Sequence, residues 1–117
     1  MSKIPTVFIS GPLKAETKGQ VETNISVAEH YANLLWLEGF FVLCPHMNSG
    51  KFLGLLDESH VIESYTQVVK LFDAIFMLPN WETSEGAVCE QTEAHRVGTL
   101  VYTDLNKLIS ELGRDER

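Results

Sequence analysis

Four short apolar runs, rich in β-branched and aromatic residues, alternate along the chain with segments of helical periodicity. The runs cover residues 6–9, 40–44, 73–78 and 99–102. Each is apolar at successive positions, as in a parallel strand that is covered on both faces. The alternation predicts an α/β fold, in which right-handed crossovers place helices on both faces of a parallel sheet.

Helices are expected between and after these runs. They cover residues 24–38, 59–71, 86–97 and 104–112, with Asn24 and Asp57 as caps of the first two. An apolar stripe at helical spacing marks the expected buried side of the first helix: Ile25, Ala28, Tyr31, Ala32, Leu35 and Trp36. Residues 13–22, 45–56 and 79–85 are predicted loops, and the charged tail 113–117 is expected to fray.

The loops after the first three strands form the expected ligand site. In open parallel sheets, ligands bind beyond the carboxyl ends of the strands, where the strand order reverses. Glu90 lies one turn into the helix after the third loop, where the helix dipole favours its ionised form. It is either a partly desolvated nucleophile or an ordinary solvated helix residue.

Length and charge narrow the choice of protein class. The 117 residues suit one domain, 1–117. The net charge of −7 argues against a nucleic acid polymer as partner, which needs a basic face, but one phosphate can still be held at a helix N-terminus. Cys44 and Cys89 are expected to be buried thiols. With neither a signal peptide nor an apolar stretch long enough for a membrane span, a soluble cytoplasmic protein is expected.

Neither a metal nor a cofactor is expected. His30, His60 and His95 have no metal-ligand spacing, and the chain has no G-x-G-x-x-G or Walker motif.

Three motifs resemble those of the nucleoside 2-deoxyribosyltransferase superfamily. Residues 8–12, FISGP, are similar to its Y-I-S/A-G-P. Residues 45–48, PHMN, and residues 73–90, DAIFMLPNWETSEGAVCE, are similar to segments of a phage and bacterial branch of largely unknown function. The three occur in the family's order, and the resemblance spans about residues 6–102.

This resemblance implies a flavodoxin- or Rossmann-like three-layer sandwich with a mostly parallel sheet of four or five strands. It also implies a homodimer or larger homo-oligomer that cleaves or exchanges the N-glycosidic bond of a nucleoside or nucleotide, as a hydrolase or a transferase. The family's nucleophile falls on Glu90, which would form a glycosyl ester with C1′. The residues expected to contact the substrate are Phe8, Ser10, Gly11, Pro12, His46, Asn48, Trp81, Ser84 and Gly86.

Ser84, six residues before Glu90, distinguishes two branches of the superfamily. The resemblance implies Asp at this position in nucleoside transferases and Ser, which helps to hold the 5′-phosphate, in nucleotide hydrolases. Ser84 therefore favours a nucleoside 5′-monophosphate as substrate. It is also a good helix cap, and the two roles are compatible.

Two positions depart from the family. Tyr65 stands where the family has an Asp that protonates the leaving base, and Phe8 stands where it has a Tyr. Glu63 or His46 could replace the missing acid. The same departures favour the alternative of a nucleotide-binding protein with weak or no activity, which sequesters or senses its ligand.

Several candidates have two interpretations. His46 lines the site or fills the end of a strand, and Asn48 bonds a base or shapes a turn. Trp81 stacks on a base or covers the site against a neighbouring subunit. Lys14 and Lys18 contact a phosphate or are simply solvated. A third function, a structural subunit of a larger assembly, would use the apolar loop residues Phe52, Leu53, Leu55 and Leu56.

Overall fold

The computed structural model describes residues 3–113 and contains one four-stranded sheet. The strands are β1 (Thr6–Ser10), β2 (Phe41–Leu43), β3 (Ala74–Met77) and β4 (Leu100–Tyr102). All neighbouring strands are parallel, in the order β2-β1-β3-β4. The α/β prediction and the parallel sheet are confirmed.

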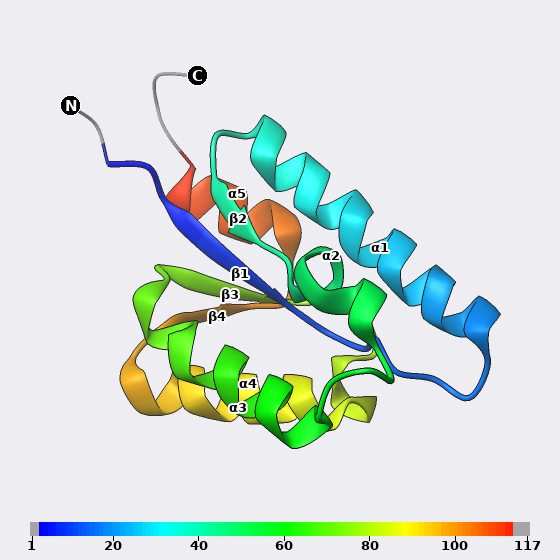
Figure 1. Ribbon diagram of the computed structural model, residues 1–117. Coiled ribbons are helices and arrows are strands. Elements are labelled where there is room, and N and C mark those ends of the chain that lie inside the picture. Colours follow the sequence, from blue (N-terminus) through cyan, green and yellow to red (C-terminus); the bar gives the residue numbers. More distant parts are fainter. Residues whose placement is uncertain (1–2, 114–117) are drawn as a thin grey trace.

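Helices cover both faces of this sheet, as Figure 1 shows. The long helix α1 (Lys18–Leu37) and the C-terminal helix α5 (Leu105–Leu112) lie on one face, and α3 (Glu58–Val68) and α4 (Glu85–Val97) lie on the other. Four short elements complete the described chain: α2 (Pro45–Ser49), η1 (Gly50–Phe52), η2 (Val69–Leu71) and η3 (Trp81–Thr83). The expected three-layer sandwich, of the flavodoxin- or Rossmann-like kind, is confirmed.

The alternation of side chains in β1 separates two buried clusters. Val7 and Ile9 belong to the cluster under α1 and α5, and Phe8 belongs to the cluster under α3 and α4. Successive side chains of a strand point to opposite faces, so Ser10 shares the face of Phe8. This places the polar end of β1 beneath α3 and α4.

The first helix begins earlier than the sequence predicts. α1 starts at Lys18, and its cap is Thr17, whose hydroxyl accepts a hydrogen bond from the N–H of Gln20 at 3.1 Å. Asn24 is therefore inside the helix, and its side chain donates to the carbonyl of Leu13 instead. The apolar spacing of α1 predicts a buried Trp36, but its side chain is 51% exposed.

Three smaller predictions are also corrected. Residues 45–52 form the helices α2 and η1, because Pro45 is suited to the first turn of a helix. Asp57 precedes α3 but makes no side-chain capping bond. Cys89 is exposed, whereas Cys44 is buried as expected. The expected fraying concerns residues 113–117, of which 114–117 lie outside the described residues.

The amino ends of the two central strands are joined by a polar contact. Asp73 Oδ2 accepts hydrogen bonds from the N–H of Thr6 at 2.9 Å and from its hydroxyl at 3.2 Å. Thr6 Oγ1 accepts in turn from the N–H of Asp73 at 2.9 Å, and Lys3 Nζ lies 2.9 Å from Asp73 Oδ1. Burial raises the pKa of Asp73, but these bonds outweigh it and hold the pKa below its ordinary value. Within residues 3–113, no helix has the length and apolar character needed to cross a membrane.

Candidate active site

Glu90 is a buried carboxyl at the carboxyl edge of the sheet. Only 7% of its surface is exposed, and Ser10 at the end of β1 is 1% exposed. Ser10 Oγ donates to Glu90 Oε1 at 2.5 Å, across 80 positions of sequence. The interpretation of Glu90 as a solvated helix residue is therefore excluded.

The surroundings of Glu90 determine the pH at which its carboxyl becomes charged. Burial raises the pKa of Glu90 to about 7, and the hydrogen bond from Ser10 opposes that rise. The sequence predicted a carboxylate stabilised by the helix dipole, but desolvation of the charge is the larger effect. Near neutral pH the charged and neutral forms of the carboxyl are therefore both populated, which suits a group that must alternate between these states.

The turn after β1 is packed tightly against the end of β3. A Cβ atom on Gly11 would lie 2.5 Å from Leu78 Cβ, so only glycine fits there. The next carbonyl, that of Pro12, accepts a hydrogen bond from His46 Nε2 at 2.8 Å. These contacts fix the backbone just beyond Ser10.

His46 supports this turn and is 4% exposed. Burial lowers the pKa of its imidazole, so the ring is neutral at pH 7. Nε2 carries the proton that it donates to Pro12, which leaves Nδ1 as an acceptor, 3.9 Å from the sulfur of Cys44. His46 thus has no second proton to give to a leaving base in this arrangement.

Tyr65 links α3 to α2. Asn48 Nδ2 donates to its hydroxyl at 2.8 Å, and Ser49 Oγ lies 2.8 Å from the same oxygen. Since Ser49 Oγ donates to the carbonyl of Pro45 at 3.4 Å, the Tyr65 hydroxyl donates to Ser49. The ring packs edge-on against Phe8, with centroids 6.2 Å apart.

Ser84 begins the helix that carries Glu90. Its hydroxyl accepts from the N–H of Ala87 at 3.2 Å, which confirms its capping role. The N–H groups of Glu85 and Gly86 precede this bond and have no partner within the helix. They are available for an anion at the start of α4.

The other two expected contact residues belong partly or wholly to the core. Phe8 is fully buried and also contacts Phe72, with centroids 5.6 Å apart. Trp81 in η3 is half-buried and packs against the cluster under α3 and α4. The expected residues thus gather at one edge of the sheet, but Phe8 and His46 face protein atoms.

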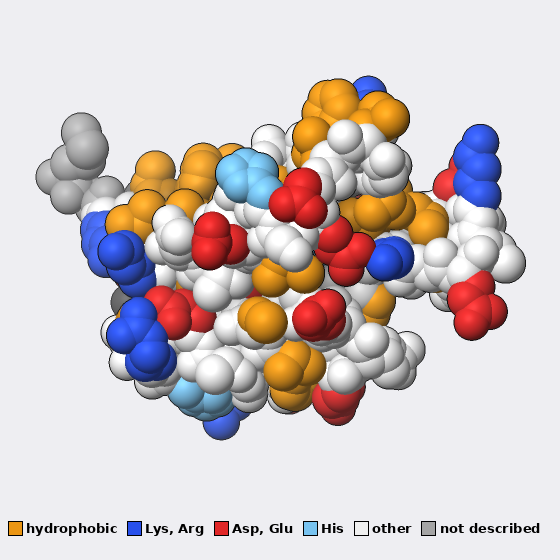
Figure 2. All heavy atoms as spheres, turned by 60° about the horizontal axis from the view of Figure 1, so that its bottom comes forward, with side chains coloured by type: hydrophobic (Ala, Val, Ile, Leu, Met, Phe, Trp, Pro, Cys, Tyr) orange, Lys and Arg blue, Asp and Glu red, His pale blue; other side chains and the backbone are white. Residues whose placement is uncertain are grey.

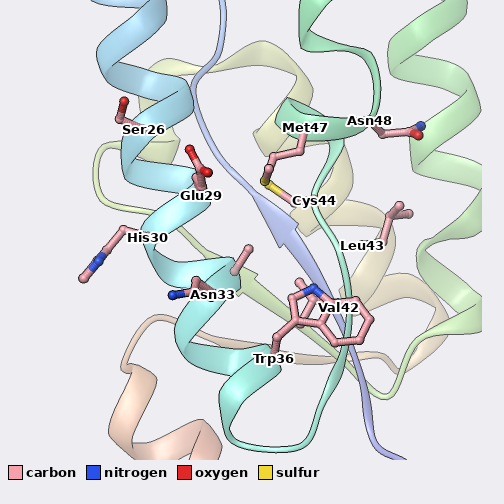
Figure 3. Close-up of a pocket in the computed structure, with 11 residues that line it drawn as sticks. Ser26, Glu29, His30, Asn33, Trp36, Val42, Leu43, Cys44, Met47 and Asn48 are labelled. Carbon is pink, nitrogen blue, oxygen red and sulfur yellow. The ribbon is translucent and has the colours of Figure 1, made fainter.

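Two surface grooves lie near this edge. One, of about 780 Å³, runs between α1, β2 and α2; Glu29 and Met47 face each other across it in Figure 3, and Asn48 is at its rim. The second, of about 980 Å³, lies between the turn after β1, the first half of α1 and the segment after β3. Of the expected contact residues, Pro12 borders this second groove, next to Lys14.

Two relationships in the site were not predicted from the sequence. The hydrogen bond from the Ser10 hydroxyl to Glu90 is the first of these. The ion pair of Lys14 with Glu58 is the second: Lys14 Nζ lies 2.7 Å from Glu58 Oε2, and the Lys14 side chain is 70% exposed. Both pairs join residues far apart in the sequence, so no local pattern reveals them. Within the described part of the chain, no cluster of three or more His, Cys, Asp or Glu side chains could hold a metal ion.

Comparison with known proteins gives one family. Residues 5–103 match the model of a domain of unknown function, DUF4406, and the chain belongs to that family. No curated protein matches the chain. The matched segment contains the whole sheet. It also contains the residues described above, from Thr6 to Glu90.

Proposed function

We propose that this DUF4406 domain cleaves or exchanges the N-glycosidic bond of a nucleoside or nucleoside 5′-monophosphate. The observation that carries the proposal is the buried Glu90 carboxyl, held by Ser10 at the edge of the sheet where ligands bind in this fold. The resemblance of residues 8–12, 45–48 and 73–90 to the nucleoside 2-deoxyribosyltransferase superfamily supplies the reaction class.

In the first step, ionised Glu90 attacks C1′ of the sugar. A C–O bond forms to the carboxylate, the bond from C1′ to the base nitrogen breaks, and the base leaves with the electron pair. In the second step, water or another base attacks C1′ and restores the carboxylate. With water, the products are the free base and the sugar with a hydroxyl at C1′, and one proton passes to the base overall.

The proton for the leaving base does not come from Tyr65, which stands where the resembled superfamily has its acid. Tyr65 donates its proton to Ser49, and His46 donates its proton to Pro12. Glu63 is exposed on α3. We therefore propose that water delivers the proton, at a cost of about 10²-fold or more in rate relative to a positioned acid.

The start of α4 supports the proposal that the substrate carries a phosphate. The unpaired N–H groups of Glu85 and Gly86 and the positive end of the helix dipole favour an anion there. Ser84 ends the loop that leads to them. A 5′-phosphate bound at this point would place the sugar toward Glu90, one turn further along the same helix.

The test is base release from a panel of deoxynucleosides and their 5′-monophosphates, measured by chromatography, with Glu90→Gln as the inactive control. Release by the wild-type protein and none by the variant is the expected result. Release that is unaffected by Glu90→Gln would contradict the proposal.

The second candidate is a nucleotide-binding protein without efficient chemistry. It is favoured by the engaged hydroxyl of Tyr65, which replaces the family acid with a structural link. Thermal stabilisation by a nucleotide, with no base release over long incubation, would support this candidate over the enzyme.

A further inference from the structure

One side of the edge strand β2 has no neighbouring strand. β2 comes first in the order β2-β1-β3-β4, so within the described part of the chain it pairs with β1 alone. The N–H of Phe41 donates to the carbonyl of Pro5, and Leu43 belongs to the same ladder with β1. Residues that bond to one neighbour alternate along a strand with residues that face the other side. The N–H and C=O of Val42 therefore face away from the sheet.

Apart from its short length, β2 has none of the usual protections of an edge strand. Such strands are commonly blunted by charged side chains or proline, or covered by another element. Residues 41–44 are Phe, Val, Leu and Cys, with neither a charge nor a proline. Next to them, the side chains of Trp36, Phe41 and Met47 are each about half exposed. Aromatic residues and Met are enriched in protein interfaces, so this edge has the composition of a binding surface.

The groove of about 780 Å³ between α1, β2 and α2 passes over this edge. Val42 and Leu43 both line the groove, although successive side chains of a strand point to opposite faces of the sheet. The groove therefore extends across the free side of β2. A chain segment lying in it would pair with the backbone of Val42 and add a strand, which is a common mode of peptide recognition.

Glu29 gives this groove a negative charge. Among the described residues that line the groove, Glu29 is the acidic one, and none is Lys or Arg. Its carboxylate points toward Met47 in Figure 3. Burial chiefly raises the pKa of the Cys44 thiol, and the charge of Glu29 adds to that rise, so the charge acts on the floor of the groove. Glu29 belongs to none of the three ion pairs of the described residues.

A basic segment complements this groove better than a second copy of the chain does. A second copy placed on the same edge by a two-fold axis would bring a second Glu29, and no Lys or Arg from its own groove. Acidic side chains are also spread over the α3 and α4 face in Figure 2, and the net charge is −7. A basic partner is therefore attracted from a distance as well as at the groove.

The spacing of Glu29 and Trp36 suits the side chains of an extended segment. The two residues lie seven positions apart on α1, so they share a side of the helix and lie about 10 Å apart along its axis. Side chains on one face of a strand recur about every 7 Å, and long side chains cover the remaining distance. One guanidinium would pair with the Glu29 carboxylate, and the next on the same face would stack on the Trp36 indole.

We propose that the free edge of β2 binds an extended, arginine-containing segment of a partner protein, which adds a fifth strand to the sheet. Val42 supplies the backbone bonds, and Glu29 and Trp36 select the arginine side chains. The inference is independent of the proposed function, because neither Ser10 nor Glu90 lines this groove.

The test is the binding of a peptide, acetyl-Val-Arg-Val-Arg-Val-Arg-Val-amide, measured by calorimetry. The control peptide carries citrulline, a neutral isostere of arginine, at each Arg position. The arginine peptide is expected to bind, and the citrulline peptide is expected to bind at least about fivefold more weakly, because it loses the ion pair and the cation–π contact.

Variants of the protein locate the binding. Glu29→Gln should weaken binding of the arginine peptide by about two- to fivefold. Trp36→Ala should weaken it by about tenfold, as expected for an aromatic residue at the centre of an interface. Both side chains are exposed, so the variants should fold. Glu22→Gln, on the same helix but outside the lining of this groove, should leave binding unchanged.

Hydrogen exchange of single amides, followed by NMR, tests the added strand. The Val42 N–H should exchange more slowly with solvent in the complex, because the peptide backbone accepts its hydrogen bond. The N–H of Leu43 faces β1, so its exchange should not change.

No binding of either peptide would overturn the inference, as would equal binding of both. Binding that leaves the exchange of the Val42 N–H unchanged would also overturn it, since the peptide would then lie elsewhere. Self-association that is lost in Trp36→Ala, without peptide binding, would instead assign this edge to a second copy of the chain.

Discussion

Ser10 Oγ donates a hydrogen bond of 2.5 Å to Glu90 Oε1, and both side chains are almost completely buried. The bond joins the end of the central strand β1 to the first half of α4. It stabilises the charged form of the carboxyl, which burial disfavours. The charge of Glu90 therefore depends on two opposing effects, and each can be altered by a single substitution.

Glu90 is expected to make the protein less stable as the pH rises. Its folded pKa of about 7 lies above the ordinary value of 4.5, so between these values the folded state binds more protons than the unfolded state. The contribution of Glu90 to stability is therefore complete below pH 4.5 and is lost as the pH rises to about 7. The free energy of unfolding of Glu90→Gln, relative to that of the wild-type protein, should rise by about 3 kcal/mol between pH 4 and pH 8. Urea unfolding at several pH values checks this; a constant difference would contradict it.

Removal of the Ser10 hydroxyl should shift the pH dependence of activity. A glycosidic nucleophile must be ionised, so kcat/KM of the wild-type protein should rise with pH through about 7. Ser10→Ala removes the bond that favours the carboxylate, so the midpoint should move to higher pH. At pH 7 the rate should fall by about tenfold and recover at higher pH. A loss that is the same at every pH would show that Ser10 does not act through the charge of Glu90.

Tyr65→Phe should affect stability more than chemistry. The substitution leaves Asn48 and Ser49 without their shared partner and should cost about 1 kcal/mol in the free energy of unfolding. If water delivers the proton to the leaving base, kcat should change by less than about twofold. Tyr31→Phe, whose ring packs against Phe76, is the matched control. A loss of kcat of about 10²-fold would identify Tyr65 as the acid instead.

Asp73→Asn should weaken the link between β1 and β3. Because the folded pKa of Asp73 is lowered, its charged form contributes stability at neutral pH, and this contribution is lost as the pH falls below 3.8. The variant should lose about 1–2 kcal/mol in the free energy of unfolding at pH 7. This difference from the wild-type protein should disappear at acidic pH. Asp57→Asn, at an exposed position with no side-chain cap bond, should have little effect at either pH.

Gly11 and Gly19 should respond in opposite directions to substitution by alanine. Gly11→Ala places a Cβ 2.5 Å from that of Leu78 and should cost about 1–3 kcal/mol. Gly19 lies in the first turn of α1 with no heavy atom within 4 Å of an added Cβ. Gly19→Ala should therefore stabilise by about 0.4–1 kcal/mol. Thermal unfolding of the two variants provides the comparison.

The parts of the fold that depend on local pattern could be predicted from the sequence. Apolar runs and turn residues located all four strands, and Ser84 was found as a helix cap. The start of α1 was missed because Asn24, a good cap by type, bonds to Leu13 instead, and Thr17 caps the helix. Trp36 follows the apolar spacing of α1, but its ring lies at the surface, edge-on against Phe41 of β2, and is 51% exposed.

The candidate site was predicted as a location rather than as an arrangement. The alternation of strands and helices and the carboxyl-edge rule predicted that Glu90 lies at the edge of the sheet where β1 ends, and Glu90 bonds to Ser10 at that edge. The change in its pKa could not be predicted, because burial depends on how α3 packs beside α4. The engagement of His46 with Pro12 likewise depends on a backbone carbonyl 34 positions away, which residue types alone do not reveal.

The distance in sequence between Ser10 and Glu90 affects when the site can exist during synthesis. β1 leaves the ribosome before its neighbour β3 and before the helix that carries Glu90. The Ser10 hydroxyl can bond to Glu90 only after β3 and α4 have been synthesised. Contacts between residues so far apart in sequence also form slowly during folding. A chain that stops before α4 would therefore have neither the Glu90 carboxyl nor a partner for Ser10. Incomplete copies of this protein should consequently lack the candidate site.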